Sequence, residues 1–217
     1  NRTVPHGLLE APSFVIVKPL TEARHWLIWH KGYNDDDAAM LFDTGIPAGS
    51  RFGPNAPTSS VFGVYGGQGN RGTTDFIGYY WHDVPGLQKF GTYTGNGSAD
   101  GPFIELGFQP AIIWMKNISD GSNRHWCVVD STRSTYNKGA SAEVLFFDSN
   151  QIESRPDNGF GQFGSKPCVD ILSNGFKLRE ANTNNVWTQV NNTHNYIYCA
   201  WAEAPSINLY GAQSNAF

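Results

Sequence analysis

Short runs of apolar residues, separated by polar and glycine-rich stretches, recur along the whole chain. Continuous apolar runs occupy residues 14–17 and 112–115, and similar runs occupy residues 26–29 and 126–129. Runs of this kind are typical of β-strands that are covered on both faces. Given strands of about five or six residues, the pattern predicts roughly ten to fourteen strands.

The segments between the apolar runs have strong turn chemistry. Residues 33–37 read Tyr-Asn-Asp-Asp-Asp, residues 66–70 read Gly-Gly-Gln-Gly-Asn and residues 182–185 read Asn-Thr-Asn-Asn. Glycine, asparagine and aspartate accept the backbone conformations that tight turns require. Nowhere does an amphipathic helical pattern persist over several turns. The sequence therefore predicts an all-β chain.

Two parts of the sequence repeat the same landmarks in the same order. Residues 5–18 (PHGLLEAPSFVIVK) correspond to residues 104–116 (IELGFQPAIIWMK). The later landmarks are the pairs His25-Trp26 and His125-Trp126, Leu41-Phe42-Asp43 and Phe146-Phe147-Asp148, and the closing segments 75–85 (DFIGYYWHDVP) and 195–205 (NYIYCAWAEAP). An ordered internal repeat predicts tandem copies of one structural unit.

The predicted fold is an antiparallel β-sandwich of jelly-roll or lectin-like type, formed by two pseudo-symmetric tandem repeats. The division is residues 1–86 for the first repeat, 87–103 for a connecting segment, 104–205 for the second repeat and 206–217 for a C-terminal tail. The connecting segment holds a strand-like piece and a glycine-rich turn, which favours one compact unit over two independent domains. The tail is polar apart from four apolar residues and can pack along a neighbour.

The two closing segments are aromatic on both faces, so we expect each closing strand at a central position in its sheet. The tryptophans paired across the repeat are expected in the core: Trp26, Trp126, Trp81 and Trp201. Cys127 and Cys199 lie in apolar runs, where a thiol behaves as a small buried hydrophobe. For Cys168 the sequence does not decide between burial and exposure.

Composition and charge exclude several classes of protein. The net charge is −4 and no run of Lys or Arg occurs, so nucleic acid is not an expected partner. No apolar stretch approaches the roughly 20 residues that cross a bilayer, so membrane insertion is not expected. The aromatic content of 14% supplies a real core. The first residue is Asn, which leaves open whether residue 1 is a native start or a fragment boundary.

Residues 90–116 (FGTYTGNGSADGPFIELGFQPAIIWMK) carry the most specific motifs of the chain. These are K-F-G-x-Y-T-G-N-G at residues 89–97, G-F-x-P-A at 107–111 and D-x-L-S-N-G-F-K-L-R at 170–179. With them, nearly the whole chain resembles a domain of unknown function that recurs in structural and tail-fibre proteins of tailed phages, cyanophages especially. Tyr80 and His82 depart from the smaller residues usual there.

The resemblance implies a virion structural module on the virion surface, and it supplies no catalytic residues. The expected function is a tail-fibre or surface adhesion domain that contacts host-surface polysaccharide or another receptor. The alternative is a ligand-free capsid decoration or connector protein, and a third hypothesis is a polysaccharide depolymerase. The expected partners include other virion proteins and further copies of the chain, as a homotrimer in a fibre.

Aromatic residues in polar loops are the candidate carbohydrate-binding residues, because flat rings stack on sugars while amides bind their hydroxyl groups. Trp187 is the first candidate, with Asn185 and Gln189 beside it; the alternative for Trp187 is a lid on the core. Tyr33 and Tyr136, each followed by Asn, complete the set.

No cofactor is expected, although calcium is possible. Asp35, Asp36 and Asp37 could supply oxygen ligands, but they lack the alternating spacing of a calcium loop, and a solvated acidic tip is the other interpretation. Enzymatic activity is not expected. The carboxylates repeated in both copies (Asp43 with Asp148, Asp83 with Glu203) and the repeated His25 and His125 are interpreted as residues that serve the shared fold.

Overall fold

The computed structural model describes residues 2–33, 38–43, 45, 48–50, 52, 56–65, 69–120, 124–133, 144–148, 169–179 and 190–203. In these ranges the chain is all-β, without any helix, which confirms the predicted class. None of the described residues forms a helix that could span a membrane. The strands are β1 (Arg2–Pro5), β2 (Phe14–Pro19), β3 (Leu27–His30), β4 (Ala38–Leu41), β5 (Ala48–Ser50), β6 (Val61–Val64), β7 (Phe76–Trp81), β8 (Gln88–Thr94), β9 (Phe103–Glu105), β10 (Pro110–Asn117), β11 (Cys127–Asp130), β12 (Leu145–Phe146), β13 (Val169–Leu172), β14 (Gly175–Leu178) and β15 (Asn195–Ala202).

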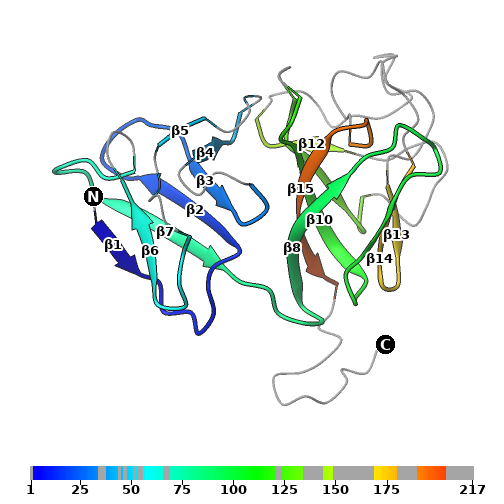
Figure 1. Ribbon diagram of the computed structural model, residues 1–217, viewed down its shortest axis with the longest axis horizontal. Coiled ribbons are helices and arrows are strands. Elements are labelled where there is room, and N and C mark those ends of the chain that lie inside the picture. The colour runs from blue at the N-terminus through cyan, green and yellow to red at the C-terminus, as the bar shows by residue number, and fades with distance from the viewer. Residues whose placement is uncertain are drawn as a thin grey trace.

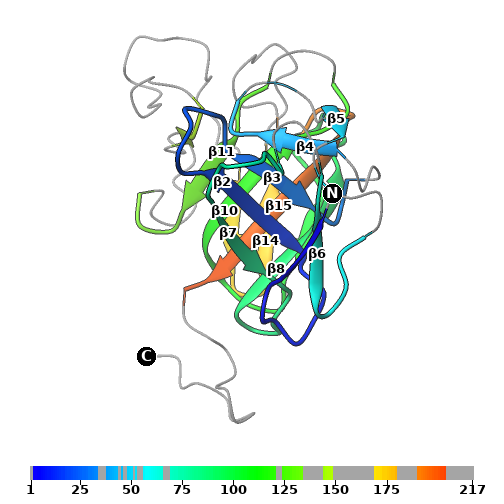
Figure 2. The same ribbon diagram turned by 90° about the vertical axis from the view of Figure 1, so that its left-hand side faces the viewer.

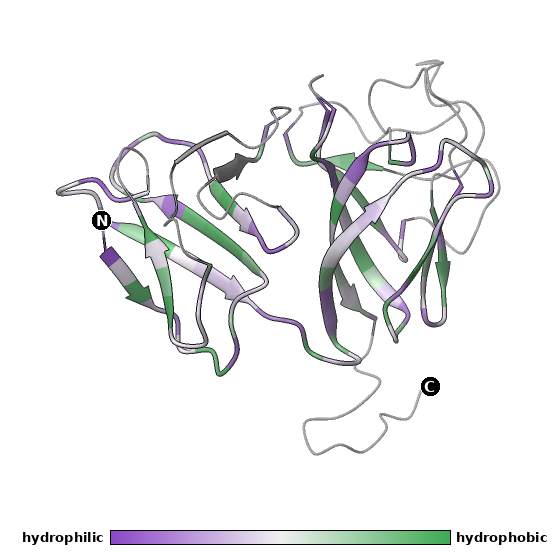
Figure 3. Cartoon of the chain, viewed as in Figure 1, coloured by the Kyte–Doolittle hydropathy of each residue, from purple (hydrophilic) through white to green (hydrophobic). Residues whose placement is uncertain are grey.

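The first half of the molecule, strands β1 to β7, consists of two antiparallel sheets. The five-stranded sheet has the order β5-β4-β3-β2-β7, and β1 pairs with β6 on its outer side (Figure 1). Figure 3 shows β2 as hydrophobic along most of its length, as expected for a strand covered on both faces. The buried residues between the two sheets are Val15, Val17, Leu27, Trp29, Phe52, Phe62 and Val64.

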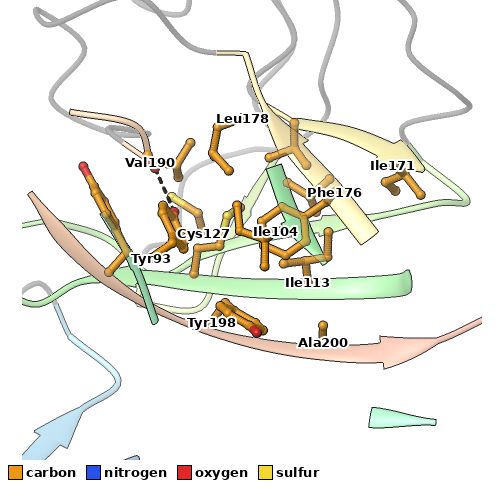
Figure 4. Close-up of a cluster of buried hydrophobic side chains, with 14 of the residues drawn as sticks. Tyr93, Ile104, Ile113, Cys127, Ile171, Phe176, Leu178, Val190, Tyr198 and Ala200 are labelled. Carbon is orange, nitrogen blue, oxygen red and sulfur yellow. Dashed lines mark hydrogen bonds between the residues drawn. The ribbon is translucent and has the colours of Figure 1, made fainter. Parts of the chain in front are cut away.

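The second half, strands β8 to β15, has the same arrangement. Its five-stranded sheet has the order β12-β11-β10-β15-β8, and a three-stranded sheet β13-β14-β9 covers its outer face. Figure 4 shows the apolar side chains packed between these two sheets, among them Ile113, Phe176, Leu178 and Tyr198. Each half is therefore a β-sandwich with its own core.

The inner faces of the two five-stranded sheets pack against each other, and we call this contact the central interface. Figure 2 shows β2 and β15 crossing at a steep angle, as in orthogonally packed sheets. The central interface is mostly aromatic. It contains buried Phe14, Ile16, Ile28, Phe90, Trp126, Ile197 and Cys199, with partly buried Phe42, Trp81, Trp114, Ile118 and Trp201.

Two buried polar side chains also join the halves. The Nε2 atom of His30 lies 3.1 Å from the carbonyl oxygen of Tyr198, and the amide of Gly32 donates to Nδ1 over 2.9 Å. Because a carbonyl only accepts, the imidazole is neutral with its proton on Nε2. The ammonium of Lys116 donates to the carbonyl oxygen of Asp43 over 2.8 Å. Burial lowers the pKa of His30 to about 4 and that of Lys116 to about 8.

Strand pairing matches between the halves wherever the sequence landmarks match. Phe14 lies opposite Trp81 in the first sheet, and Ile112 lies opposite Trp201 in the second. Gly7 and Gly107, which precede the matching strands, both have positive φ, 73° and 83°. The tandem origin and the residue boundaries of the two repeats stay predictions, although these registers agree with them.

Three details differ from the sequence prediction. The structure describes fifteen strands, one more than the largest number predicted. Very short strands such as β12 were missed because they leave no periodic pattern in the sequence. Strand β15 is central as predicted, whereas β7 lies at the edge of its sheet. Trp126 is fully buried, but Trp26 is 40% exposed because its ring lies outside the central interface, beside Phe42 and the Lys18 ammonium.

The two cysteines predicted to be buried, Cys127 and Cys199, are buried. Burial raises the pKa of Cys199 well above its ordinary value, which makes it an unreactive core residue. Cys168 lies outside the described residues.

Candidate functional site

The connection between β14 and β15 carries the main candidate residues, and its C-terminal end is held by a buried asparagine. Asn191 is fully buried. Its Oδ1 accepts a hydrogen bond from the Asn96 amide over 3.1 Å, and its Nδ2 donates to the Ser98 carbonyl over 2.7 Å and to Asn96 Oδ1 over 3.2 Å. These three hydrogen bonds are directed at the turn after β8 and fix the two segments to each other.

We call residues 190–192, together with the turn after β8 that holds them, the base of the β14–β15 connection. Two tyrosines connect this base to the core. The Tyr93 hydroxyl donates to the Val190 carbonyl over 2.7 Å, the bond drawn in Figure 4. The Tyr93 ring stacks on the ring of Tyr196 with centroids 4.8 Å apart, and the Tyr196 hydroxyl accepts from the Asn192 amide over 3.0 Å. Residues 190–192 are therefore held through both main chain and side chain.

The glycines of the Thr-Gly-Asn-Gly motif allow this close contact. A Cβ atom on Gly95 would lie 2.0 Å from the Asn192 carbonyl oxygen, so only glycine fits. Gly97 has a φ of 67°, which costs a residue with a side chain far more than glycine, and its amide donates to the Asn191 carbonyl over 2.6 Å. The motif that was most specific in the sequence serves to hold the base of the β14–β15 connection.

Charged and polar side chains surround the base. The Lys177 ammonium lies 2.6 Å from Asp100, and its hydrogen bond and positive charge lower the pKa of that exposed carboxyl. Arg179, at the N-terminal end of the connection, is paired with Asp170. We call Asp100, Lys177 and Arg179 the polar rim. It offers positively charged hydrogen-bond donors and a negatively charged acceptor.

Most of the predicted site residues lie outside the described residues. These are Trp187, Asn185 and Gln189, which fall between Arg179 and Val190, together with Tyr136 and the three aspartates Asp35, Asp36 and Asp37. Tyr33 is described: it is half-buried directly after β3, and its amide donates to the His30 carbonyl over 3.1 Å. The structure does not test the assignment of any of these residues to a ligand.

Strand direction separates two of the predicted segments. Strands β11 and β15 both run antiparallel to β10, so they run parallel to each other. The segment of Tyr136 follows the C-terminal end of β11, whereas the segment of Trp187 precedes the N-terminal end of β15. The two segments therefore leave the second sheet at opposite ends, which the sequence alone did not reveal.

Two of the carboxylates repeated in both halves, Asp148 and Asp83, each bind a backbone amide and a side chain. Asp148 is almost fully buried, and its Oδ1 accepts from His125 Nδ1 over 2.9 Å and from the Trp126 amide over 3.3 Å. Asp83 accepts from the Phe90 amide over 2.9 Å and pairs with Lys31. Within the described part of the chain, no group of three or more His, Cys, Asp or Glu side chains could hold a metal ion. Calcium binding by the three aspartates stays a prediction.

Sequence reasoning missed Asn191, the residue around which the base is built. It stands in a polar run, Asn-Asn-Thr-His-Asn, that reads as an ordinary loop. The available signal was the glycine motif of residues 94–97, because closely spaced glycines indicate a backbone that another segment approaches. That signal names the turn but not its partner, which lies about a hundred residues away in the sequence.

The fold and this base define an all-β protein of two sandwiches that share an aromatic interface. The chain belongs to the family described as Domain of unknown function (DUF7483), whose model matches residues 1–205. Comparison with curated proteins and with solved structures gave no match.

Proposed function

We propose that the chain is a non-catalytic module of a virion surface, which binds host-surface carbohydrate through the β14–β15 connection. The observation that supports this most is the fixed base at residues 190–192, because ligand-binding residues are commonly carried on loops that a rigid scaffold positions. Trp187 stands three residues before Val190 in the sequence. The resemblance to phage structural proteins supports the virion setting.

The chemistry of the segment suits a sugar. An indole ring offers a flat apolar face, and the amides of Asn185 and Gln189 can each donate and accept hydrogen bonds with hydroxyl groups. The polar rim of Asp100, Lys177 and Arg179 adds further partners. Asp148 and Asp83 each accept from a backbone amide and pair with a side chain of the same half, His125 and Lys31, which supports a binding role over the cleavage of a glycosidic bond.

Binding of the purified chain to a panel of host-surface polysaccharides tests the proposal. We expect saturable binding that Trp187→Ala weakens at least tenfold. Trp26→Ala is the matched control, because Trp26 is a partly exposed tryptophan of the first half, and it should bind as the wild type does. Release of new reducing ends during the assay would show a depolymerase. Absence of binding by a folded chain would favour a capsid decoration or connector role.

The same assay should be accompanied by sedimentation analysis, because a fibre module is expected to form a homotrimer with other copies of the chain. A monomer that still binds polysaccharide would separate the adhesion proposal from the fibre setting.

The base makes a separate prediction about stability. Asn191→Ala should lower the free energy of unfolding by about 2 kcal/mol, because the three hydrogen bonds of the fully buried Asn191 side chain to Asn96 and Ser98 are lost. Asn192→Ala is the control, since its contact to Tyr196 is made by the backbone amide, and it should change stability by less than about 0.5 kcal/mol. Chemical denaturation measures both; equal effects would mean that the Asn191 side chain does not hold the base.

A further inference from the structure

The first five-stranded sheet ends at β7 with an edge that bears apolar side chains. No described strand pairs with the free side of β7, and Ile77 and Tyr79 are 37% and 42% exposed. Natural sheets protect such an edge with lysine, proline or a bulge, or cover it. The strand sequence, Phe-Ile-Gly-Tyr-Tyr-Trp, contains none of the protecting residues. The sequence of β7 is therefore that of a strand whose edge is covered by another segment.

The second half shows what covers the matching edge. There β8 pairs with β15 over its whole length, with Phe90 opposite Cys199 and Gly91 opposite Tyr198. The Phe90 ring is buried in the central interface, 5.7 Å from the ring of Phe14 and 5.6 Å from that of Trp201. Strand β8 follows β7 in the sequence, so the strand after the first closing strand completes the second sheet.

The sequence after β15 repeats the sequence after β7. Residues 85–94 read PGLQKFGTYT and residues 205–214 read PSINLYGAQS. Gln88 follows Trp81 at the same spacing as Asn208 follows Trp201, Tyr210 stands where β8 has Phe90, and a glycine follows in both. One departure is Ser206, which stands where Gly86 has a φ of 74°.

Contacts between matching residues show that the halves are related by an approximate two-fold axis. The Phe42 and Phe147 rings, which occupy matching positions, lie 5.4 Å apart, and those of Trp81 and Trp201 lie 6.5 Å apart. Matching residues meet near a two-fold axis, where contacts are approximately reciprocal. Figure 1 shows β7 and β15 ending on the same side of the molecule. Strand β8 follows β7 of the first half and pairs with the second sheet. The two-fold relation therefore predicts that the segment after β15 pairs with the first sheet.

We propose that residues 206–214 of the same chain pair with β7 as an antiparallel edge strand, in the register of β8 on β15. Transfer of that register places Tyr210 opposite Tyr79, Gly211 opposite Gly78 and Ala212 opposite Ile77. Tyr210 then covers the exposed apolar side chains on the inner face. The occupant is the chain's own C-terminal segment, because Trp81 and Trp201 bring the starting point of that segment beside the edge.

A cavity on the outer face of the first half fits the same register. Lys89 of β8 reaches across the outer face and donates to the carbonyl of Glu105 in β9. The matching residue of the C-terminal segment is Leu209, opposite Tyr80. A cavity of about 250 Å³ lies there, lined in part by Val4, Val64, Gly78 and Tyr80. An apolar residue thus replaces a charged one beside the apolar part of a cavity that Arg2, Thr74 and Asp75 also line.

Paired cysteines in the full-length chain test the register. In a Cys168→Ser background, Tyr79→Cys with Tyr210→Cys should form a disulfide within one chain, since residues opposite each other in neighbouring strands have close Cβ atoms. Tyr79→Cys with Leu209→Cys is the control, because these side chains point to opposite faces, and it should stay reduced. A disulfide between two chains would show that a second copy supplies the strand, and no disulfide in either pair would overturn the proposal.

Hydrogen exchange gives an independent measurement. In the wild-type chain the outward-facing amides of β7 should exchange at least tenfold more slowly than in Tyr210→Asp, while the amides of β10 should exchange alike in both. Equal exchange of β7 in the two proteins would overturn the proposal. Polysaccharide binding should be the same in both proteins, because the edge and the β14–β15 connection belong to different halves.

Discussion

Trp126→Ala is expected to lower the free energy of unfolding by about 3–5 kcal/mol, the cost of removing a large buried aromatic side chain. Trp126 is fully buried in the central interface. Its ring contacts the Phe42 ring of the first half at 5.5 Å, and the Lys116 ammonium lies 6.0 Å from its centroid. Truncation leaves a cavity between two rigid sheets, which can close only by moving one half against the other.

The matched control is Trp26→Ala, at the position that corresponds to Trp126 in the first half. Because Trp26 is 40% exposed, its replacement should cost only about 1 kcal/mol. Guanidinium denaturation followed by circular dichroism measures both variants. Equal losses of unfolding free energy in the two variants would contradict the deeper burial of Trp126.

Acidification from pH 6.5 to pH 4 is expected to remove about 3 kcal/mol of stability through His30 alone, at about 1.4 kcal/mol for each pH unit of difference between the folded and unfolded pKa. Burial lowers the pKa of His30 from 6.5 to about 4 in the folded protein. Between these two values the unfolded chain binds a proton that the folded chain does not, so stability falls as the pH falls. The contribution is complete above pH 6.5 and levels off below pH 4.

The comparison of variants isolates this histidine from the carboxyl groups that titrate in the same range. His30→Gln should be less stable than the wild type at pH 7, but its stability should fall less between pH 6.5 and pH 4. Thermal unfolding over a pH series measures the slopes, and a slope unchanged in His30→Gln would show that His30 is not the group responsible.

The strands and their matching order could be predicted from the sequence because buried strands leave a direct record in apolar runs. The alignment of residues 14–17 with 112–115 agrees with the pairing of β2 with β7 and of β10 with β15. Local patterns of this kind depend on the burial of each strand and not on its neighbours.

The differences arise where burial depends on a distant segment. Trp26 and Trp126 both follow Arg-His and precede an apolar run, yet only Trp126 lies in the central interface, so this shared pattern does not distinguish them. The aromatic content of β7 predicted a central strand, and the described chain places it at an edge. Asn191 is buried only because the turn after β8 packs on it, which a local interpretation cannot anticipate.

For the candidate carbohydrate-binding site, too, the sequence predicts what depends on residue type and not what depends on distant segments. The chemistry of Trp187, Asn185 and Gln189 could be predicted from composition, because it depends on residue types. The base that holds their segment could not, because it is assembled from residues 93–98 and 190–196, which meet only in the folded chain.

The central position of β15 bears on how the protein folds during synthesis. Strands β2, β3, β4 and β7 all lie within residues 14–81, so the first sheet can form as soon as that part has left the ribosome. The second sheet cannot, because β8 and β10 both pair with β15, at residues 195–202. Until then we expect the inner face of the first sheet, with Phe14 and Ile16, to be exposed to water. The nascent chain would then present an apolar surface of the kind that chaperones bind.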